Sequence, residues 1–182
     1  MAPGSRTALD LQFAARGLRP QRLLVLNYDP LVQADANVPL HQSRRWFDPR
    51  ALTRDYIDTI ARCSGNALNY VVHEWRDLNE YPKKENGFRP TEASYRGNPE
   101  QGGMVDYGAI ILSQGVDADV ASGKFDEVII WGGPGFGYFE SRMVGPTAYY
   151  VNSSPLVRAA PMRNYIVMGL NYERGLSLIH IS

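Results

Sequence analysis

Cysteine, long apolar segments and net charge are all scarce in this 182-residue sequence. Its only cysteine, Cys63, cannot form a disulfide within the chain, and its place on the apolar side of a predicted helix favours a small buried side chain over a nucleophile. No run approaches the roughly 18 apolar residues of a membrane helix, so no membrane span is predicted. The 19 basic residues balance the 19 acidic ones, which argues against a nucleic-acid partner. Residues 1–30 lack the uninterrupted apolar segment of a signal peptide, and the localisation stays open.

Histidine is scarce as well, which bears on metal binding. His41 and His73 are far apart in the sequence and no H-E-x-x-H motif is present, so no zinc site is predicted. An oxygen-rich site that joins His73 and Glu74 to Asp29 or Glu173 stays open. The sequence predicts no particular cofactor.

The composition that remains is that of one globular domain. Hydrophobic residues make up 44% of the chain and charged residues 21%, which is ordinary for a folded protein of this length. We expect a flexible leader over residues 1–20 and a single domain over residues 21–175. The arginines of the first segment are interpreted as solvated; they are Arg6, Arg16, Arg19 and Arg22.

Strand and helix patterns alternate along the domain. Continuous apolar runs predict buried strands, and apolar residues at helical spacing predict helices. The predicted strands are 22–27, 67–75, 126–131 and 165–170, and the predicted helices are 49–64 and 105–122, the second with a possible break near Gly115. Asp48 and Pro49 are a typical helix start. The alternation predicts an α/β fold with a mostly parallel sheet and flanking helices in three layers, Rossmann-like or flavodoxin-like.

The connections between these elements carry further expectations. Residues 83–103 are rich in Gly, Pro and charged residues and predict a long surface loop, which in a compact domain is often functional. A short helical turn is expected at residues 140–142, a possible strand at 148–151, and an irregular connection at 152–163.

Polar side chains follow the predicted strands, and the carboxyl ends of parallel strands meet at one edge of a sheet. We therefore expect these residues to converge on a site over an aromatic rim, with acid/base groups and substrate-binding groups. The candidate acid/base residues are Asp29, Glu74, Glu140 and Glu173, with His73 as an auxiliary, and the candidate substrate-binding residues are Asn27, Trp131, Tyr138, Arg142, Asn171 and Arg174. The alternative is that these residues only mark where each strand meets water. For Arg142 and Arg174, a structural pairing with a nearby glutamate is a further alternative.

The glycine-rich segment GGPGFG at residues 132–137 follows the predicted central strand. It lacks the G-x-G-x-x-G spacing of a dinucleotide loop and the lysine and serine of a P-loop. It is similar to the oxyanion loop of class I glutamine amidotransferases, but Cys63 has no strand-to-helix elbow that would supply the nucleophile. Ser141 has no G-x-S-x-G context either. The glycines are expected to permit positive φ angles and close backbone approach.

Several motifs together resemble a group of uncharacterised bacterial proteins. They are NYDP at 27–30, the Asp48-Pro49 helix with its Cys-Ser-Gly exit, Glu-Asn-Gly-Phe at 85–88, FESRMVGP at 139–146 and MGLNYERG at 168–175. The resemblance spans residues 22–175 and implies no established activity. Residues 176–182, LSLIHIS, resemble a translated sequencing adapter, which would mean a truncated reading frame; a short natural strand is the alternative.

Two functions follow as hypotheses. The first is a hydrolase-like domain that acts on a polar substrate, a glycan or a peptide, through the carboxylates at the strand ends. The second is a non-catalytic carbohydrate-binding or protein-binding module of a larger protein. The sequence leaves the enzyme question, the substrate and the oligomeric state undecided.

Overall fold

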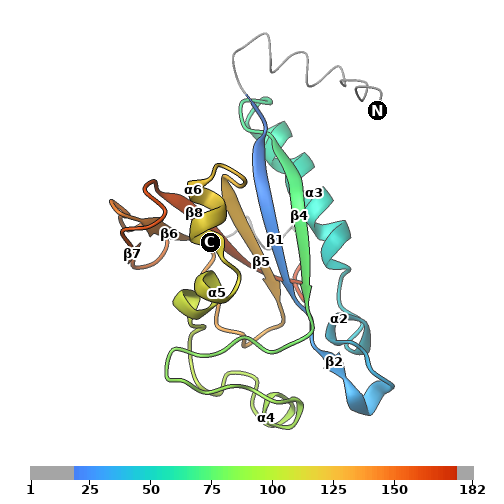
Figure 1. Ribbon diagram of the computed structural model, residues 1–182. Coiled ribbons are helices and arrows are strands. Elements are labelled where there is room, and N and C mark those ends of the chain that lie inside the picture. The colour runs from blue at the N-terminus through green and yellow to red at the C-terminus, as the bar shows by residue number, and fades with distance from the viewer. Residues whose placement is uncertain (1–18, 176–182) are drawn as a thin grey trace, which may run out of the picture.

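A six-stranded sheet forms the centre of the molecule (Figure 1). The computed structural model describes residues 19–175. The strand order is β4-β1-β5-β8-β6-β7, with β1 (Gln21–Tyr28), β4 (Tyr70–Leu78), β5 (Glu127–Gly132) and β8 (Tyr165–Asn171) mutually parallel. The strand β6 (Arg142–Gly145) is antiparallel to β8, and β7 (Leu156–Val157) is parallel to β6. The predicted mostly parallel α/β architecture is therefore confirmed.

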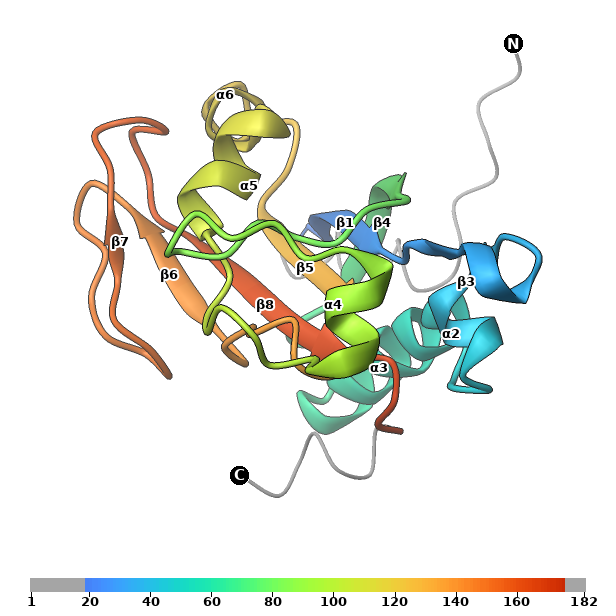
Figure 2. The same cartoon turned by 90° about the horizontal axis from the view of Figure 1, so that it is seen from below.

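Helices cover both faces of this sheet, as the view in Figure 2 shows. The helix α3 (Pro49–Cys63) packs on one face, where the indole N–H of Trp131 on β5 donates to Thr53 Oγ1 at 2.7 Å. The helices α5 (Tyr107–Ser113) and α6 (Val116–Ala121) lie on the other face, where the hydroxyl of Tyr165 on β8 donates to Asp117 Oδ1 at 3.1 Å. Because both faces are covered, β1 is a continuous apolar run whose residues Leu23 to Leu26 are fully buried.

Local sequence signals set the helix ends. The Asp48 carboxylate accepts hydrogen bonds from the backbone N–H groups of Arg50 and Ala51, and Pro49 occupies the first turn, as predicted. Gly115, with φ of +65°, separates α5 from α6 and confirms the predicted break. The expectation for Cys63 is wrong, because the last turn of α3 leaves this residue exposed.

The strand β4 starts and ends three residues later than the sequence predicts, since it runs from Tyr70 to Leu78 instead of over residues 67–75. The side chain of Ser64 accounts for the late start. Its Oγ accepts from the backbone N–H of Leu68 at 3.0 Å and donates to the Leu68 carbonyl at 3.2 Å, which holds the chain in a turn. As a result, His73 and Glu74 lie in the middle of an edge strand and not at its carboxyl end.

The connections differ from expectation in several places. The prediction of a helical turn at residues 140–142 is wrong, because Arg142 begins β6 and residues Arg142 to Val144 pair with β8. The predicted strand at 148–151 is irregular, and the predicted connection after it contains β7. The predicted loop at 83–103 contains the helix α4 (Glu92–Gly97). The connection after β1 contains a small two-stranded sheet and two short helices; these are β2 (Leu31–Val32), η1 (Gln33–Asp35), β3 (Val38–Pro39) and α2 (Leu40–Ser43).

The amino-terminal edge of the sheet is held by a buried carboxylate. Asp126 lies 2.7 Å from Arg19 and 3.1 Å from Arg22, and Arg163 approaches it at 3.5 Å. Burial alone would raise the pKa of Asp126, but the hydrogen bonds from Arg19 and Arg22 outweigh it and lower this pKa overall. Arg19 and Arg22 are thus structural, which corrects their assignment to a solvated leader.

The other two arginines of the predicted leader, at positions 6 and 16, and the predicted adapter segment lie outside the described residues. Within residues 19–175, no helix is both long and apolar enough to cross a membrane.

Replacement of Asp126 by Asn should reduce the free energy of unfolding at pH 7 by about 3 kcal/mol, because two arginine side chains lose their buried charged partner. A depressed carboxyl pKa stabilises the folded state above the unfolded-state pKa of about 3.9, and this contribution is lost as the pH falls towards the folded-state pKa. The difference between wild type and Asp126→Asn in urea unfolding should therefore be constant near neutrality and shrink below about pH 4.

The matched control is Asp55→Asn, which changes an exposed aspartate of α3. Equal stabilities of Asp126→Asn and Asp55→Asn at pH 7 would contradict the structural role of the Asp126 cluster.

Candidate functional site

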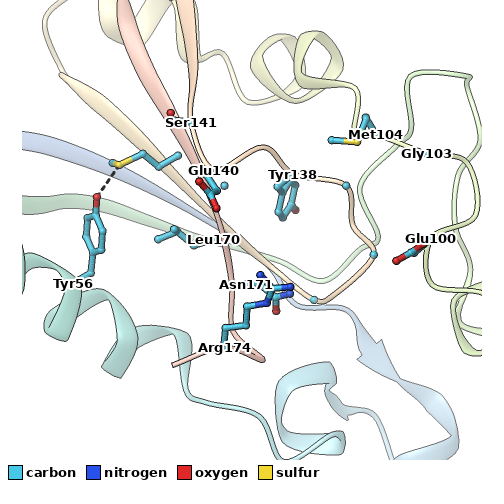
Figure 3. A pocket seen from close by; sticks show the side chains of 15 residues that line it. Tyr56, Glu100, Gly103, Met104, Tyr138, Glu140, Ser141, Leu170, Asn171 and Arg174 are labelled. Carbon is cyan, nitrogen blue, oxygen red and sulfur yellow. Dashed lines mark hydrogen bonds between the residues drawn. The ribbon is translucent and has the colours of Figure 1, made fainter. Parts of the chain in front are cut away.

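A cavity of about 570 Å³ lies beside the carboxyl-terminal end of β8 (Figure 3). It opens between α3, the segment around residues 100–104, the loop after β5 and the last residues of β8. Its lining consists of Tyr56, Glu100, Gly103, Met104, Gly133, Gly135, Gly137, Tyr138, Glu140, Ser141, Met168, Gly169, Leu170, Asn171 and Arg174. The edge at which it lies is the edge that the sequence predicts for a site.

The cavity exists because β8 extends beyond its antiparallel partner. β6 pairs only with residues Tyr165 to Val167, and beyond that point the backbone of the incoming loop approaches β8 instead. The N–H of Gly169 lies 3.1 Å from the carbonyl oxygen of Phe139 and 3.2 Å from that of Glu140. A Cβ at position 169 would lie 2.4 Å from Tyr138 Cβ, so only glycine allows the loop to pass this close.

The glycine-rich loop, residues 133–138, is fixed from behind by a buried lysine. Lys84 is 1% exposed, and its ammonium donates to the carbonyl oxygens of Gly103 at 2.8 Å, Gly135 at 2.7 Å and Phe136 at 2.9 Å. Burial lowers the pKa of Lys84, an effect that the negative charge of Glu100 partly opposes. The segment that contains Lys84 therefore shapes the cavity wall, although nothing in its sequence pattern distinguishes this lysine from its neighbour.

The glycines of this loop behave as predicted. Gly135 and Gly137 have φ angles of +76° and +80°, and a Cβ on Gly137 would lie 2.6 Å from the carbonyl oxygen of Gly103. At its far end, the loop is held by α5, because the backbone N–H of Phe139 donates to the hydroxyl of Tyr107 at 2.8 Å.

Three of the predicted site residues present polar groups in the cavity. Asn171 and Arg174 extend from the end of β8, and Glu140 comes from the loop (Figure 3). The Oδ1 atom of Asn171 accepts from the backbone N–H of Glu173 at 2.8 Å, which leaves its NH₂ group as a donor. Arg174 forms no ion pair within residues 19–175, whereas Glu140 accepts from Asn152 Nδ2 at 3.3 Å. Glu100, which sequence reasoning missed, adds a second carboxylate to the lining.

The predicted pair His73 and Glu74 does not join this site. β4 is separated from β8 by β1 and β5, a distance of about 14 Å at ordinary strand spacing. Glu74 lies 2.6 Å from Arg76 and 2.6 Å from Lys124, and the hydrogen bonds from these two residues lower its pKa. The ring of His73 packs edge-on against Phe125. A general acid requires a raised pKa, so the environment of Glu74 favours a structural role.

The aromatic rim expected from the sequence is largely interior. Trp131 is fully buried in the core, and its N–H is already donated to Thr53. Tyr138 lines the cavity, but its hydroxyl is buried without a hydrogen-bond partner in the described part of the chain. Burial raises the pKa of Tyr138 well above its ordinary value, so this phenol stays protonated.

Two further predicted binding residues have structural partners. Arg142 lies over the ring of Tyr107 at 5.1 Å and donates through Nε to the Ser154 carbonyl at 3.0 Å. Asn27 is buried at the end of β1, where its Nδ2 donates to Asp77 Oδ1 at 2.9 Å.

Asp29 forms a buried pair that the sequence did not indicate. Its Oδ2 lies 2.5 Å from His41 Nδ1, and its Oδ1 accepts from the backbone N–H of His41 at 3.0 Å. The histidine ring also packs edge-on against Tyr172. The pair ties α2 to the end of β1, outside the cavity lining, while Glu173 is exposed next to Arg174.

The arrangement of the described side chains does not favour a metal site. Among residues 19–175, no three His, Cys, Asp or Glu side chains come together as a metal-binding group. The oxygen-rich set that the sequence left open is dispersed, because His73 and Glu74 lie on β4, Asp29 follows β1 and Glu173 follows β8.

Replacement of Gly169 by Ala should close part of the cavity. The new Cβ would meet Tyr138 Cβ and the Phe139 carbonyl oxygen, so we expect a loss of about 2 kcal/mol in the free energy of unfolding. The control is Gly97→Ala in α4, where a Cβ meets nothing within 4 Å. Urea unfolding of the two variants measures the difference, and an unaffected Gly169→Ala would contradict the close packing of the loop on β8.

No protein-family model, curated protein or solved structure matches this chain. The resemblance to bacterial proteins that the sequence motifs indicate therefore stays an expectation. Any functional conclusion has to come from the geometry of the cavity.

Proposed function

We propose that this protein binds a small polar molecule in the cavity beside β8. The observation that carries the proposal is a cavity of about 570 Å³ in which Asn171 and Arg174 present hydrogen-bond donors that the described residues leave unused. Cavities of roughly 300–1,000 Å³ with a few convergent polar groups are typical of small-molecule sites. The cavity lies at the carboxyl edge of the parallel strands, which is where α/β folds usually bind ligands.

The lining supports a ligand with both polar and apolar parts. Met104, Met168 and Leu170 supply apolar surface, and Glu140 and Arg174 supply opposite charges. Short oligosaccharides and peptides combine these properties, because they present hydroxyl or amide groups together with hydrocarbon surface.

Hydrolysis of the bound molecule is a second candidate function, favoured by one specific observation. Two carboxylates, Glu100 and Glu140, enter the cavity from different walls (Figure 3). A pair of carboxylates on either side of a scissile bond is the arrangement by which glycoside hydrolases supply an acid and a base. Glu140 belongs to the four carboxylates expected from the sequence, and Glu100 is an addition to them.

Binding is tested with a variant that fills the cavity. In NMR titrations with short oligosaccharides and with di- to tetrapeptides, at least one compound should shift the backbone signals of Gly169 and Asn171 in the wild type. Ser141→Phe, which places a large ring in the cavity, should abolish these shifts. Ser113→Phe, an exposed change on α5, should leave them intact. Shifts that persist in Ser141→Phe would place the ligand elsewhere.

Catalysis is tested on any compound that binds. If Glu140 transfers a proton, Glu140→Gln should lower kcat by about 10²-fold or more while KM changes little. The exposed Glu80→Gln serves as control. Binding without turnover in the wild type would leave the protein as a binding module, and equal kcat values in both variants would exclude Glu140 as the acid or base.

A further inference from the structure

The glycine-rich loop separates the cavity from a buried positive charge. The Lys84 ammonium is held only by carbonyl oxygens, and no carboxylate within residues 19–175 forms an ion pair with it. A buried cation without a direct ion pair is costly, because carbonyl dipoles replace only part of its hydration and the charge of Glu100 acts on it without direct contact. An anion on the other side of the loop would add to the negative charge that Glu100 supplies.

The peptide planes of the loop point their N–H groups away from this lysine. The Phe136 carbonyl oxygen accepts from Lys84, and the Gly137 carbonyl oxygen accepts from the Val105 N–H at 3.0 Å. In a trans peptide the N–H points opposite to the C=O, so the N–H groups of Gly137 and Tyr138 face away from Lys84 and Val105. Neither N–H has an acceptor in the described part of the chain.

Two successive N–H groups, those of Gly137 and Tyr138, are therefore without an acceptor in residues 19–175, and Gly137 has a positive φ of +80°. Successive backbone N–H groups in a turn can form an anion-binding concavity. Gly135, Gly137 and Tyr138 line the cavity. Hydrogen bonds from Lys84 to the carbonyl oxygens also polarise these peptides, which strengthens their N–H groups as donors.

We infer that the glycine-rich loop is the anion subsite of the cavity and binds the carboxylate of a small carboxylic acid, with Arg174 and Asn171 as additional donors. The inference rests on the proposed function, because it names the chemistry of the molecule that occupies the cavity. Arg174 suits this role, since a guanidinium can donate two parallel hydrogen bonds to a carboxylate.

The two carboxylates of the lining favour a carboxylate ligand over a phosphate. Glu100 and Glu140 repel a dianion more strongly than a monoanion. They also accept hydrogen bonds, so a ligand that carries a hydroxyl or an amine beside its carboxylate can satisfy both kinds of group. The ligand class is therefore a small hydroxy acid or amino acid, or a larger molecule that ends in one.

Lactate and lactamide provide a matched pair of probes, because they differ in the charged group alone. At constant ionic strength, sodium lactate should shift the backbone amide signals of Gly137 and Tyr138 saturably, and lactamide should not. Arg174→Gln should weaken lactate binding about tenfold, the value of one charge-assisted hydrogen bond. Arg62→Gln, an exposed change at the end of α3, should leave binding unchanged.

A second variant tests the charge behind the loop. Lys84→Met should weaken lactate binding, and unchanged lactate binding in a folded Lys84→Met variant would show that the charge behind the loop does not act on the anion. Should Lys84→Met fail to fold, Arg174→Gln still decides the question. Arg174 is exposed, so its replacement leaves no cavity in the hydrophobic core.

Three results would overturn the inference. Equal shifts with lactamide and lactate would show that the cavity binds polar molecules without an anion subsite, and the proposed function would survive. Tighter binding of inorganic phosphate than of lactate would overturn the assigned ligand class. No shift at Gly137 or Tyr138 with lactate, together with no binder among the oligosaccharides and peptides, would refute both the subsite and the proposed function.

Discussion

The parallel pairing of β5 with β8 is the interaction on which the candidate site depends. Five residue pairs, from Val128 with Val167 to Gly132 with Asn171, align the two strands so that they end together. The pairing continues for one more hydrogen bond, from the Tyr172 N–H to the Gly132 carbonyl oxygen at 3.1 Å. The loop that leaves β5 and the residues that leave β8 must therefore lie at the same edge. Without this alignment, Arg174 would not share a cavity with the glycine-rich loop.

Lys84 holds the loop in place beyond the point where the hydrogen-bond ladder between strands ends. Beyond the strand ends, the carbonyl oxygens of a loop have no ladder partner, and buried unpaired carbonyl groups are costly. The ammonium of Lys84 satisfies three of them at once and joins two segments that are distant in the sequence. One buried charge thus gives an irregular loop a fixed shape, and it leaves the N–H side of that loop available to a ligand.

The charged side chains at the two ends of the parallel strands are arranged differently. At the amino-terminal edge, the single carboxylate of Asp126 lies within ion-pair distance of three arginines, so each member of this cluster has a charged partner. At the carboxyl edge, Arg174 and Lys84 lack carboxylate partners within residues 19–175, and Glu100 and Glu140 face the same cavity. The carboxyl edge therefore brings charged side chains of both signs to one cavity, as is typical of ligand sites.

The sequence by itself determined the layered α/β architecture, the start of α3 at Asp48 and Pro49, and the edge of the sheet at which polar groups gather. These features follow from local periodicity and from capping residues, which act within a few positions of the chain. It also indicated Asn171 and Arg174, at the end of β8, and Glu140, in the loop that follows β5. Tertiary structure alone decided that Trp131 lies in the core, that Glu74 sits mid-strand among cations, and that Lys84 reaches the glycine-rich loop. Burial and long-range partners depend on which segments meet in space, and a three-residue shift such as that of β4 is enough to move a side chain away from the site.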